Sequence, residues 1–115
     1  MNPSNQLAVL TQPSPRIHFV ERLRNITRIH GTRDEYESGF WVVAPVTADK
    51  LINGDIYFHE AQGQASYYGG KILGYRIQEG GDLAGRLIFH FKSTPGHQGV
   101  QAGRGGWGNE KKIVW

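Results

Sequence analysis

Residues 51–59 read Leu-Ile-Asn-Gly-Asp-Ile-Tyr-Phe-His, which predicts the end of a short helix, a turn and the start of a strand. Thr47 is expected to be the N-cap of that helix, because its side-chain oxygen can accept a hydrogen bond from the first helical turn. Asn53-Gly54 is typical of a helix end, and the strand is predicted over residues 55–60. The stretch therefore contributes one helix and one strand to the predicted fold.

Alternation within this strand indicates which side chains share a face. Tyr57 and His59 lie on the same face as Asp55, whereas Ile56 and Phe58 lie on the other. A single aromatic residue in such a strand is more often part of the core than part of a binding site.

Four further strands are predicted over residues 40–44, 71–78, 85–92 and 111–115. A second helix is predicted over residues 17–30, because Phe19, Leu23 and Ile26 follow i, i+4, i+7 spacing. The other reading of this segment is an extended one, because Ile, Thr and Val are frequent in it. The acidic stretch 34–39 is expected to be a loop. Since strands and helices do not alternate, the set predicts a mainly-β α+β domain with about five or six strands, in a small barrel or a strongly curved sheet.

The chain has 115 residues, of which 16 are glycine and none is cysteine. This length fits one domain, predicted at 16–115 behind a flexible N-terminal arm at 1–15 that contains three prolines. The absence of cysteine excludes disulfides, cysteine-based zinc sites and a thiol nucleophile. No apolar run approaches the roughly 18 residues of a spanning helix. The first 15 residues do not resemble a signal peptide, so a cytoplasmic protein without a membrane partner is expected.

Positive charge is concentrated near the N-terminus, although the net charge is only +3. In the predicted helix, Arg24 and Arg28 lie opposite the apolar face and Arg22 lies at its flank. Such residues can contact phosphates and contribute salt-sensitive affinity for nucleic acid. The other reading of the same arginines is a solvated helix face. Lys71 and Arg104 are the remaining candidates for phosphate binding.

Tyr67, Tyr68 and Trp107 lie in polar, glycine-flanked stretches that are expected to be loops. A large flat side chain beside glycines suits stacking on a base, because glycine lets a ligand approach the backbone. For Trp107, packing as a lid on the core is an equally good interpretation.

No residue pattern indicates catalysis, a metal or a cofactor. The five histidines do not have metal-ligand spacing, so a site built from His59, His90 and His97 is not favoured over structural roles. No G-x-S-x-G motif marks a nucleophile, and Gly69-Gly70-Lys71 is not a phosphate-binding loop.

Residues 40–115 resemble the PUA-like superfamily, which includes the PUA, ASCH, EVE and YTH domains. The resemblance is carried by Gly39-Phe-Trp-Val-Val, by the helix at Thr47–Ile52, by the "helix, Gly-Asp, strand" step of residues 51–59, and by Gly70-Lys-Ile-Leu-Gly-Tyr-Arg-Ile. The EVE type is the nearest. The glycine-rich segment around Trp107 departs from the pattern.

The resemblance implies a pseudo-barrel that binds nucleic acid, DNA or RNA, with a modified or flipped base in an aromatic-lined pocket. Trp41 matches an aromatic position on the opening strand, and Tyr57 and His59 match positions after the Gly-Asp step. The expected function is therefore a non-catalytic nucleic-acid-binding module. The expected base-binding residues are Trp41, Tyr57, His59, Tyr67, Tyr68 and Trp107.

Two alternatives remain open at this stage. The ASCH branch contains amidohydrolases of modified nucleosides that use a Lys, a Thr and an acid, for which Lys71, Thr94 and Glu60 are of the right types. The other alternative is a protein-interaction module anchored by Trp107 and the glycine-rich segment around it. Oligomeric state is not predicted.

Overall fold

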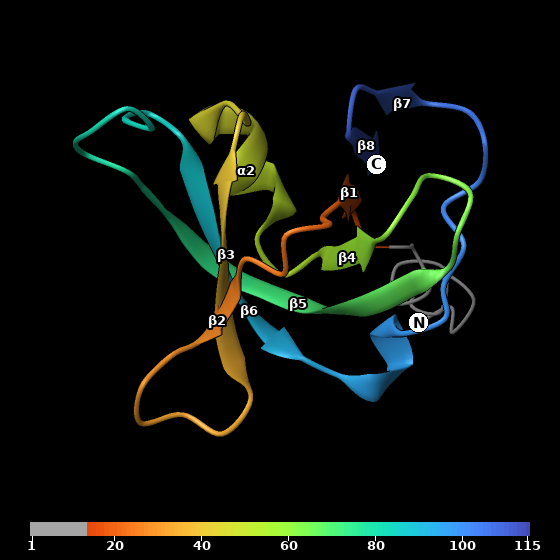
Figure 1. Ribbon diagram of the computed structural model, residues 1–115, viewed down its shortest axis with the longest axis horizontal. Helices are drawn as coiled ribbons and strands as arrows, with labels where there is room; N and C mark the ends of the chain where they lie inside the picture. Colours follow the sequence, from red (N-terminus) through yellow and green to blue (C-terminus); the bar gives the residue numbers. More distant parts are fainter. Residues whose placement is uncertain (1–13) are drawn as a thin grey trace, which may run out of the picture.

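The computed structural model describes residues 14–115 as a mainly-β α+β domain (Figure 1). Its elements are β1 (Arg16–Val20), β2 (Ile26–Arg28), β3 (Glu35–Trp41), α2 (Pro45–Leu51), β4 (Asp55–His59), β5 (Ser66–Ile77), β6 (Leu87–Ser93), the 3-10 turn η1 (Pro95–His97), β7 (Trp107–Gly108) and β8 (Lys111–Val114). The predicted arm at 1–15 lies outside the described residues except for its last two. Within residues 14–115, no helix is long and apolar enough to cross a membrane.

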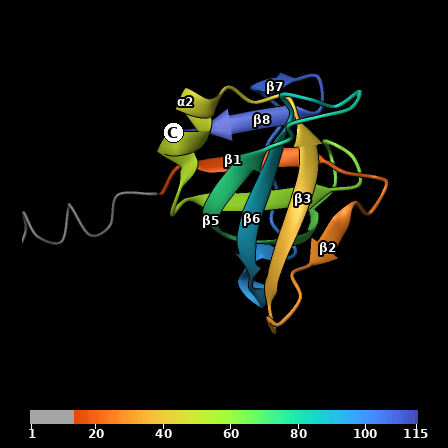
Figure 2. The ribbon, with the colours of Figure 1, turned by 90° about the vertical axis from the view of Figure 1, so that its left-hand side faces the viewer.

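The described strands form one open mixed sheet in the order β2-β3-β6-β5-β4-β1-β8-β7. β1 and β4 are parallel, and all other neighbours are antiparallel. The first part of the long strand β5 pairs with β4 and the rest with β6, so β5 joins the two halves of the sheet (Figures 1 and 2). No closed barrel is found among the described strands, and the strand count is eight rather than five or six.

The sheet is strongly bent, and this bend brings distant strands together. Phe19 of β1 and Trp41 of β3 stack with ring centroids 3.8 Å apart, although β6, β5 and β4 separate their strands in the sheet. Lys111 Nζ at the start of β8 also donates a hydrogen bond of 2.8 Å to the carbonyl oxygen of Val42, just after β3. Register shifts between β3 and β6, β4 and β5, and β5 and β6 account for the bend, because bulges increase local twist.

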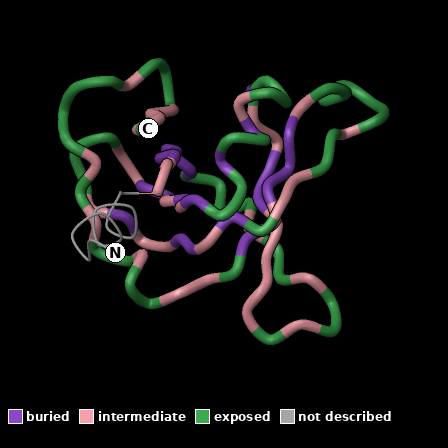
Figure 3. Tube along the Cα trace, turned by 180° about the vertical axis from the view of Figure 1, so that it is seen from behind, coloured by how far each residue is buried: buried purple, intermediate pink, exposed green. Residues whose placement is uncertain are grey.

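The core lies inside this bend, where the buried segments meet (Figure 3). Ile56 and Phe58 are buried, which confirms the predicted apolar face of the strand over residues 55–60. The remaining members come from the other central strands and from α2: Ile17, Phe19, Val43, Ala48, Leu51, Ile72, Leu87, Phe89 and Phe91. α2 is the predicted short helix, and Ala48 and Leu51 are its buried residues.

Several local predictions are wrong. Residues 17–30 form no helix, but β1, a loop and β2. The helical spacing of Phe19, Leu23 and Ile26 is overridden because β1 pairs on both sides, with β4 and β8, and buries Ile17 and Phe19. The predicted loop at 34–39 is most of β3, whose pairing with β6 supplies its backbone hydrogen bonds.

Smaller errors concern helix and loop boundaries. Ala44, not Thr47, is the N-cap of α2, and Pro45 begins the helix, where its missing N–H would have no helical partner. Tyr67 and Tyr68 lie within β5 rather than in a loop, and Trp107 lies in β7.

Candidate functional site

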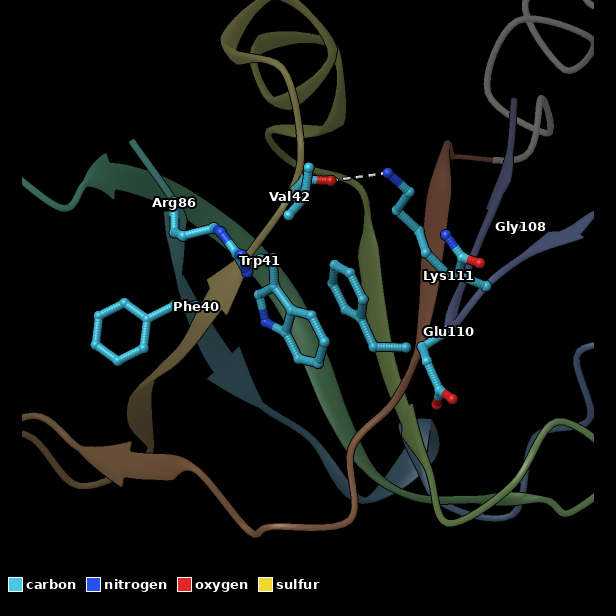
Figure 4. Close-up of a pocket in the computed structure, with 9 residues that line it drawn as sticks. Phe40, Trp41, Val42, Arg86, Gly108, Glu110 and Lys111 are labelled. Atoms are coloured by element: carbon cyan, nitrogen blue, oxygen red, sulfur yellow. Dashed lines mark hydrogen bonds between the residues drawn. The ribbon is translucent and has the colours of Figure 1, made fainter. Parts of the chain in front are cut away.

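A recess with a volume of about 390 Å³ is lined in part by the stacked rings of Phe19 and Trp41. It is named here the Trp41 recess, and its lining comprises Phe19, Phe40, Trp41, Val42, Arg86, Gly108, Asn109, Glu110 and Lys111. Figure 4 shows Trp41 and most of the other lining side chains. The lining joins the end of β3 to the β7–β8 turn, so the bend of the sheet creates the recess. Its volume falls within the range of about 300–1,000 Å³ common to small-molecule sites.

The indole of Trp41 is held in a defined orientation. Its ring lies nearly parallel to that of Phe19, at an interplanar angle of 14°. Its Nε1 donates a hydrogen bond of 3.1 Å to Oγ of the buried Ser38. Because one ring face and the ring nitrogen are already engaged, the indole is a fixed surface rather than a mobile side chain.

Polar groups surround this surface. Arg86 lies beside Trp41, and Glu110 and Lys111 lie across the recess from it (Figure 4). The guanidinium and ammonium groups are donors, whereas the Glu110 carboxylate is an acceptor. An aromatic surface with both kinds of group at its edge can hold a planar ring and hydrogen-bond its edge.

A second recess adjoins the first and shares Phe40, Trp41 and Glu110 with it. It has a volume of about 480 Å³ and extends to the loop between β1 and β2. Its other lining residues are Val20, Glu21, Arg22, Leu23, Asn25, Gly39 and Leu83. Trp41 therefore lines both recesses.

Trp107 lines a separate recess of about 470 Å³ together with Gln62, Gly63, Gln101, Gly103 and Arg104. Its Nε1 donates a hydrogen bond of 3.0 Å to the Gly103 carbonyl oxygen. The indole meets the imidazole of His59 edge to face, with centroids 5.9 Å apart and planes at 86°. Trp107 therefore covers a histidine rather than the apolar core.

Tyr57 and His59 belong to this histidine-containing face of the sheet, not to the Trp41 recess. The Tyr57 ring packs against the rings of both His18 and His97, with ring centroids 4.7 Å and 5.0 Å away. His59 is fully buried. Burial, together with the nearby Asp55 carboxylate, raises the pKa of Tyr57.

Tyr67 and Tyr68, the two remaining residues predicted to bind a base, line none of the described recesses. Tyr67 lies under the guanidinium of Arg24, 3.8 Å from ring centroid to Cζ, and its hydroxyl donates a hydrogen bond of 2.8 Å to the Glu21 carbonyl oxygen. Tyr68 packs edge to face against Tyr36 and Phe91 at the border of the core. The six predicted base-binding residues are thus divided among separate places.

The predicted phosphate-binding residues also lie apart. Arg22, which lines the recess that adjoins Trp41, pairs with Glu110 at 3.3 Å, and Arg24 pairs with Glu60. Arg28 is exposed on β2, and Arg104 lines the Trp107 recess. Lys71 Nζ lies 3.2 Å from Asp55 Oδ1 on β4. The common helical face predicted for Arg24 and Arg28 does not exist.

Sequence reasoning missed several residues of the Trp41 recess: Phe19, Phe40, Arg86, Glu110 and Lys111. Only Phe40 had a local signal, as the neighbour of Trp41 in the motif Gly39-Phe-Trp-Val-Val. The others come from distant segments that meet because the sheet bends.

Residues 14–115 contain no group of three or more histidine or acidic side chains placed to hold a metal ion. Comparison with known proteins adds no relative: no family model, no curated protein and no solved structure matches the chain.

Proposed function

We propose that this protein is a nucleic-acid-binding domain that holds one base, flipped or modified, in the Trp41 recess. The observation that carries the proposal is the fixed indole of Trp41, stacked on Phe19 and bordered by Arg86, Glu110 and Lys111. Base stacking on an aromatic ring is tolerant of base identity, and polar groups at the edge of the ring can add selectivity. A PUA-like pseudo-barrel is part of the proposal, and the strong bend of the sheet supports it.

Positive side chains around the recess support a phosphate backbone as the rest of the ligand. Arg86 and Lys111 line the Trp41 recess, Arg22 lines the adjoining recess, and Arg24 lies two residues further along the chain. The ion pairs Arg22–Glu110 and Arg24–Glu60 are both exposed to solvent. Because an exposed ion pair contributes little stability, a phosphate can replace the carboxylate beside each arginine at small cost.

The first test is the binding of fluorescein-labelled oligonucleotides, single-stranded and duplex, with plain and modified bases, followed by fluorescence anisotropy. Trp41→Ala should weaken binding by about 1–3 kcal/mol, which is the usual contribution of one stacked base. Trp115→Ala is the matched control, because Trp115 is exposed and lines none of the described recesses. Trp41→Phe, which keeps a ring on Phe19, controls for loss of folding.

Salt dependence separates phosphate contacts from stacking. Arg22→Gln and Arg24→Gln together should reduce the slope of log affinity against log salt, whereas Trp41→Ala should leave it unchanged. Lys50→Gln, on the exposed side of α2, is the control for loss of one positive charge and is compared with Arg22→Gln alone. Equal binding by the wild type and Trp41→Ala would mean that the base is not held in the Trp41 recess.

One observation favours hydrolysis as a second candidate function. Thr94 Oγ1 is hydrogen-bonded to His97 Nδ1, His97 Nε2 lies 2.9 Å from Asp55 Oδ1, and Asp55 also contacts Lys71. A carboxylate that fixes one imidazole nitrogen as a donor leaves the other free to accept the threonine proton, as a general base does.

The four described recesses do not include these residues, which weakens the enzyme proposal. Glu60, the acid expected from sequence, pairs with Arg24 instead. The test is release of the acyl group from an N-acylated nucleoside. Turnover that is lost in Thr94→Val but kept in Trp41→Ala would favour hydrolysis over base binding.

A further inference from the structure

Leu23 is the most exposed large apolar side chain of the described residues, at 88%. It lies in the segment 21–25 between β1 and β2, named here the Leu23 loop, and lines the recess beside Trp41. A single exposed leucine is common on protein surfaces. What distinguishes this one is the way its loop is held.

The Leu23 loop is pinned from both ends. The Leu23 backbone N–H donates a hydrogen bond of 2.7 Å to Oε1 of Glu21, a buried residue. The Glu21 carbonyl oxygen accepts from the Tyr67 hydroxyl at 2.8 Å. On the other side, Asn25 Nδ2 donates to the Gly39 carbonyl oxygen at 2.8 Å. The loop therefore presents Leu23 to solvent in a fixed position.

Arginines lie immediately on either side of Leu23. Arg22 is held by Glu110, and Arg24 by Glu60 and the Tyr67 ring. Their side chains nevertheless remain 58% and 59% exposed. An exposed leucine whose two neighbours in the chain are exposed arginines matches the stacked bases and flanking phosphates of a nucleic-acid duplex.

We infer that the Leu23 loop is a wedge that enters a duplex while the displaced base occupies the Trp41 recess. Extruding a base leaves a gap in the stack and costs unstacking energy, which an inserted apolar side chain offsets. Arg22 and Arg24 bind the phosphates next to the gap. This inference rests on the proposed function and narrows its ligand to a base-paired duplex with one base extruded.

The neighbouring apolar residues Phe40, Val42 and Leu83 also suit a protein partner. A duplex is favoured over a protein partner for two reasons. Arg22 and Arg24 are adjacent to the exposed Leu23 in the chain, and Leu23 and Trp41 both line the recess that adjoins the Trp41 recess. A protein interface would use the apolar rim without any dependence on base pairing, so the two possibilities separate in one experiment.

The experiment compares the affinity of the wild type and Leu23→Ala for three oligonucleotides of one sequence: a single strand, a fully paired duplex, and a duplex with one central mismatch. Each is made as DNA and as RNA, since the two duplexes differ in groove geometry. Leu73→Ala, an exposed leucine on β5 outside the recesses, is the matched control. Leu23→Met keeps an apolar side chain of similar volume and should restore binding.

We expect Leu23→Ala to lose about 10-fold in affinity for the paired duplex, less for the mismatched duplex, and under about twofold for the single strand, because a mismatched or unpaired base costs less to extrude. Equal losses on all three oligonucleotides, or no loss beyond that of Leu73→Ala, would overturn the wedge. Trp41→Ala in the same series tests the proposed function separately. If only Trp41→Ala loses affinity, base binding stands without the wedge; if the wild type binds none of the three, both are rejected.

Discussion

His18 and His59 share a hydrogen bond, with His18 Nδ1 2.9 Å from His59 Nε2. The partner of His59 Nδ1 is the Gln64 carbonyl oxygen at 2.8 Å, which can only accept, so this nitrogen carries a proton. A neutral His59 then has an unprotonated Nε2, and His18 Nδ1 donates to it. The two side chains are 1% and 0% exposed, so the fold holds both imidazoles neutral.

This pair predicts a loss of stability in mild acid. Burial, with smaller contributions from His59 and the nearby Arg16 and Lys112, lowers the pKa of His18 from 6.5 to about 4. Burial also lowers the pKa of His59. Below pH 6.5 the two histidines bind protons in the unfolded chain, whereas in the folded chain they stay neutral to lower pH. The free energy of unfolding should therefore be nearly constant above pH 7 and fall between pH 6.5 and 4.

The measurement is urea denaturation at intervals from pH 4 to pH 8. A single such histidine contributes a slope of at most about 1.4 kcal/mol per pH unit. His18→Gln should flatten the slope in this range, whereas His30→Gln, at an exposed position, should not. An unfolding free energy that is the same at pH 5 and pH 7 in the wild type would contradict a buried neutral pair.

Two glycines of β5 should differ sharply in their tolerance of alanine. A Cβ at Gly70 would lie 1.9 Å from the Lys92 carbonyl oxygen of β6, which is backbone and cannot move aside. A Cβ at Gly74 would have no atom within 4 Å. We expect Gly70→Ala to destabilise the domain by at least about 3 kcal/mol and Gly74→Ala to change stability by no more than about 1 kcal/mol. Thermal denaturation of both variants checks this, and similar melting temperatures would refute it.

Asp55 should stabilise the folded domain, whether or not the hydrogen-bonded groups of Thr94 and His97 next to it have a catalytic role. Its Oδ1 accepts from His97 Nε2 at 2.9 Å and from Lys71 Nζ at 3.2 Å. Asp55→Asn removes the charge from both interactions and should cost about 1–3 kcal/mol in unfolding free energy. Asp82→Asn, in an exposed turn, is the control, and an equal effect of the two substitutions would show that the contacts of Asp55 are not stabilising.

The elements predicted correctly are those whose pattern is local. Ile56 and Phe58 mark the apolar face of the strand over residues 55–60, and α2 is bounded by turn residues, so both elements could be placed within a residue or two. The conformation of residues 17–30 could not be predicted. The spacing of Phe19, Leu23 and Ile26 fits a helix, but β1 pairs with β4 and β8, which are distant in the sequence. Non-local pairing, not local preference, determines the conformation there.

The same distinction applies to the site. Trp41 could be named only through the resemblance to the PUA-like superfamily, which implies an aromatic at this position, and it lines the recess. Arg86, Glu110 and Lys111 carry no motif, and they reach Trp41 only through the bend of the sheet. Tyr57 and His59 share a face, as predicted, but that face is the one with the buried histidine pair.

The position of β1 between β4 and β8 has a consequence for synthesis of the chain. β8 is the last of the eight described strands to be synthesised. One edge of β1 therefore stays unpaired until nearly the whole domain has been translated. An exposed edge is a template for pairing with another chain. Nascent chains that stall before residue 111 should therefore be more prone to aggregation than the full chain, in which both edges of β1 are paired.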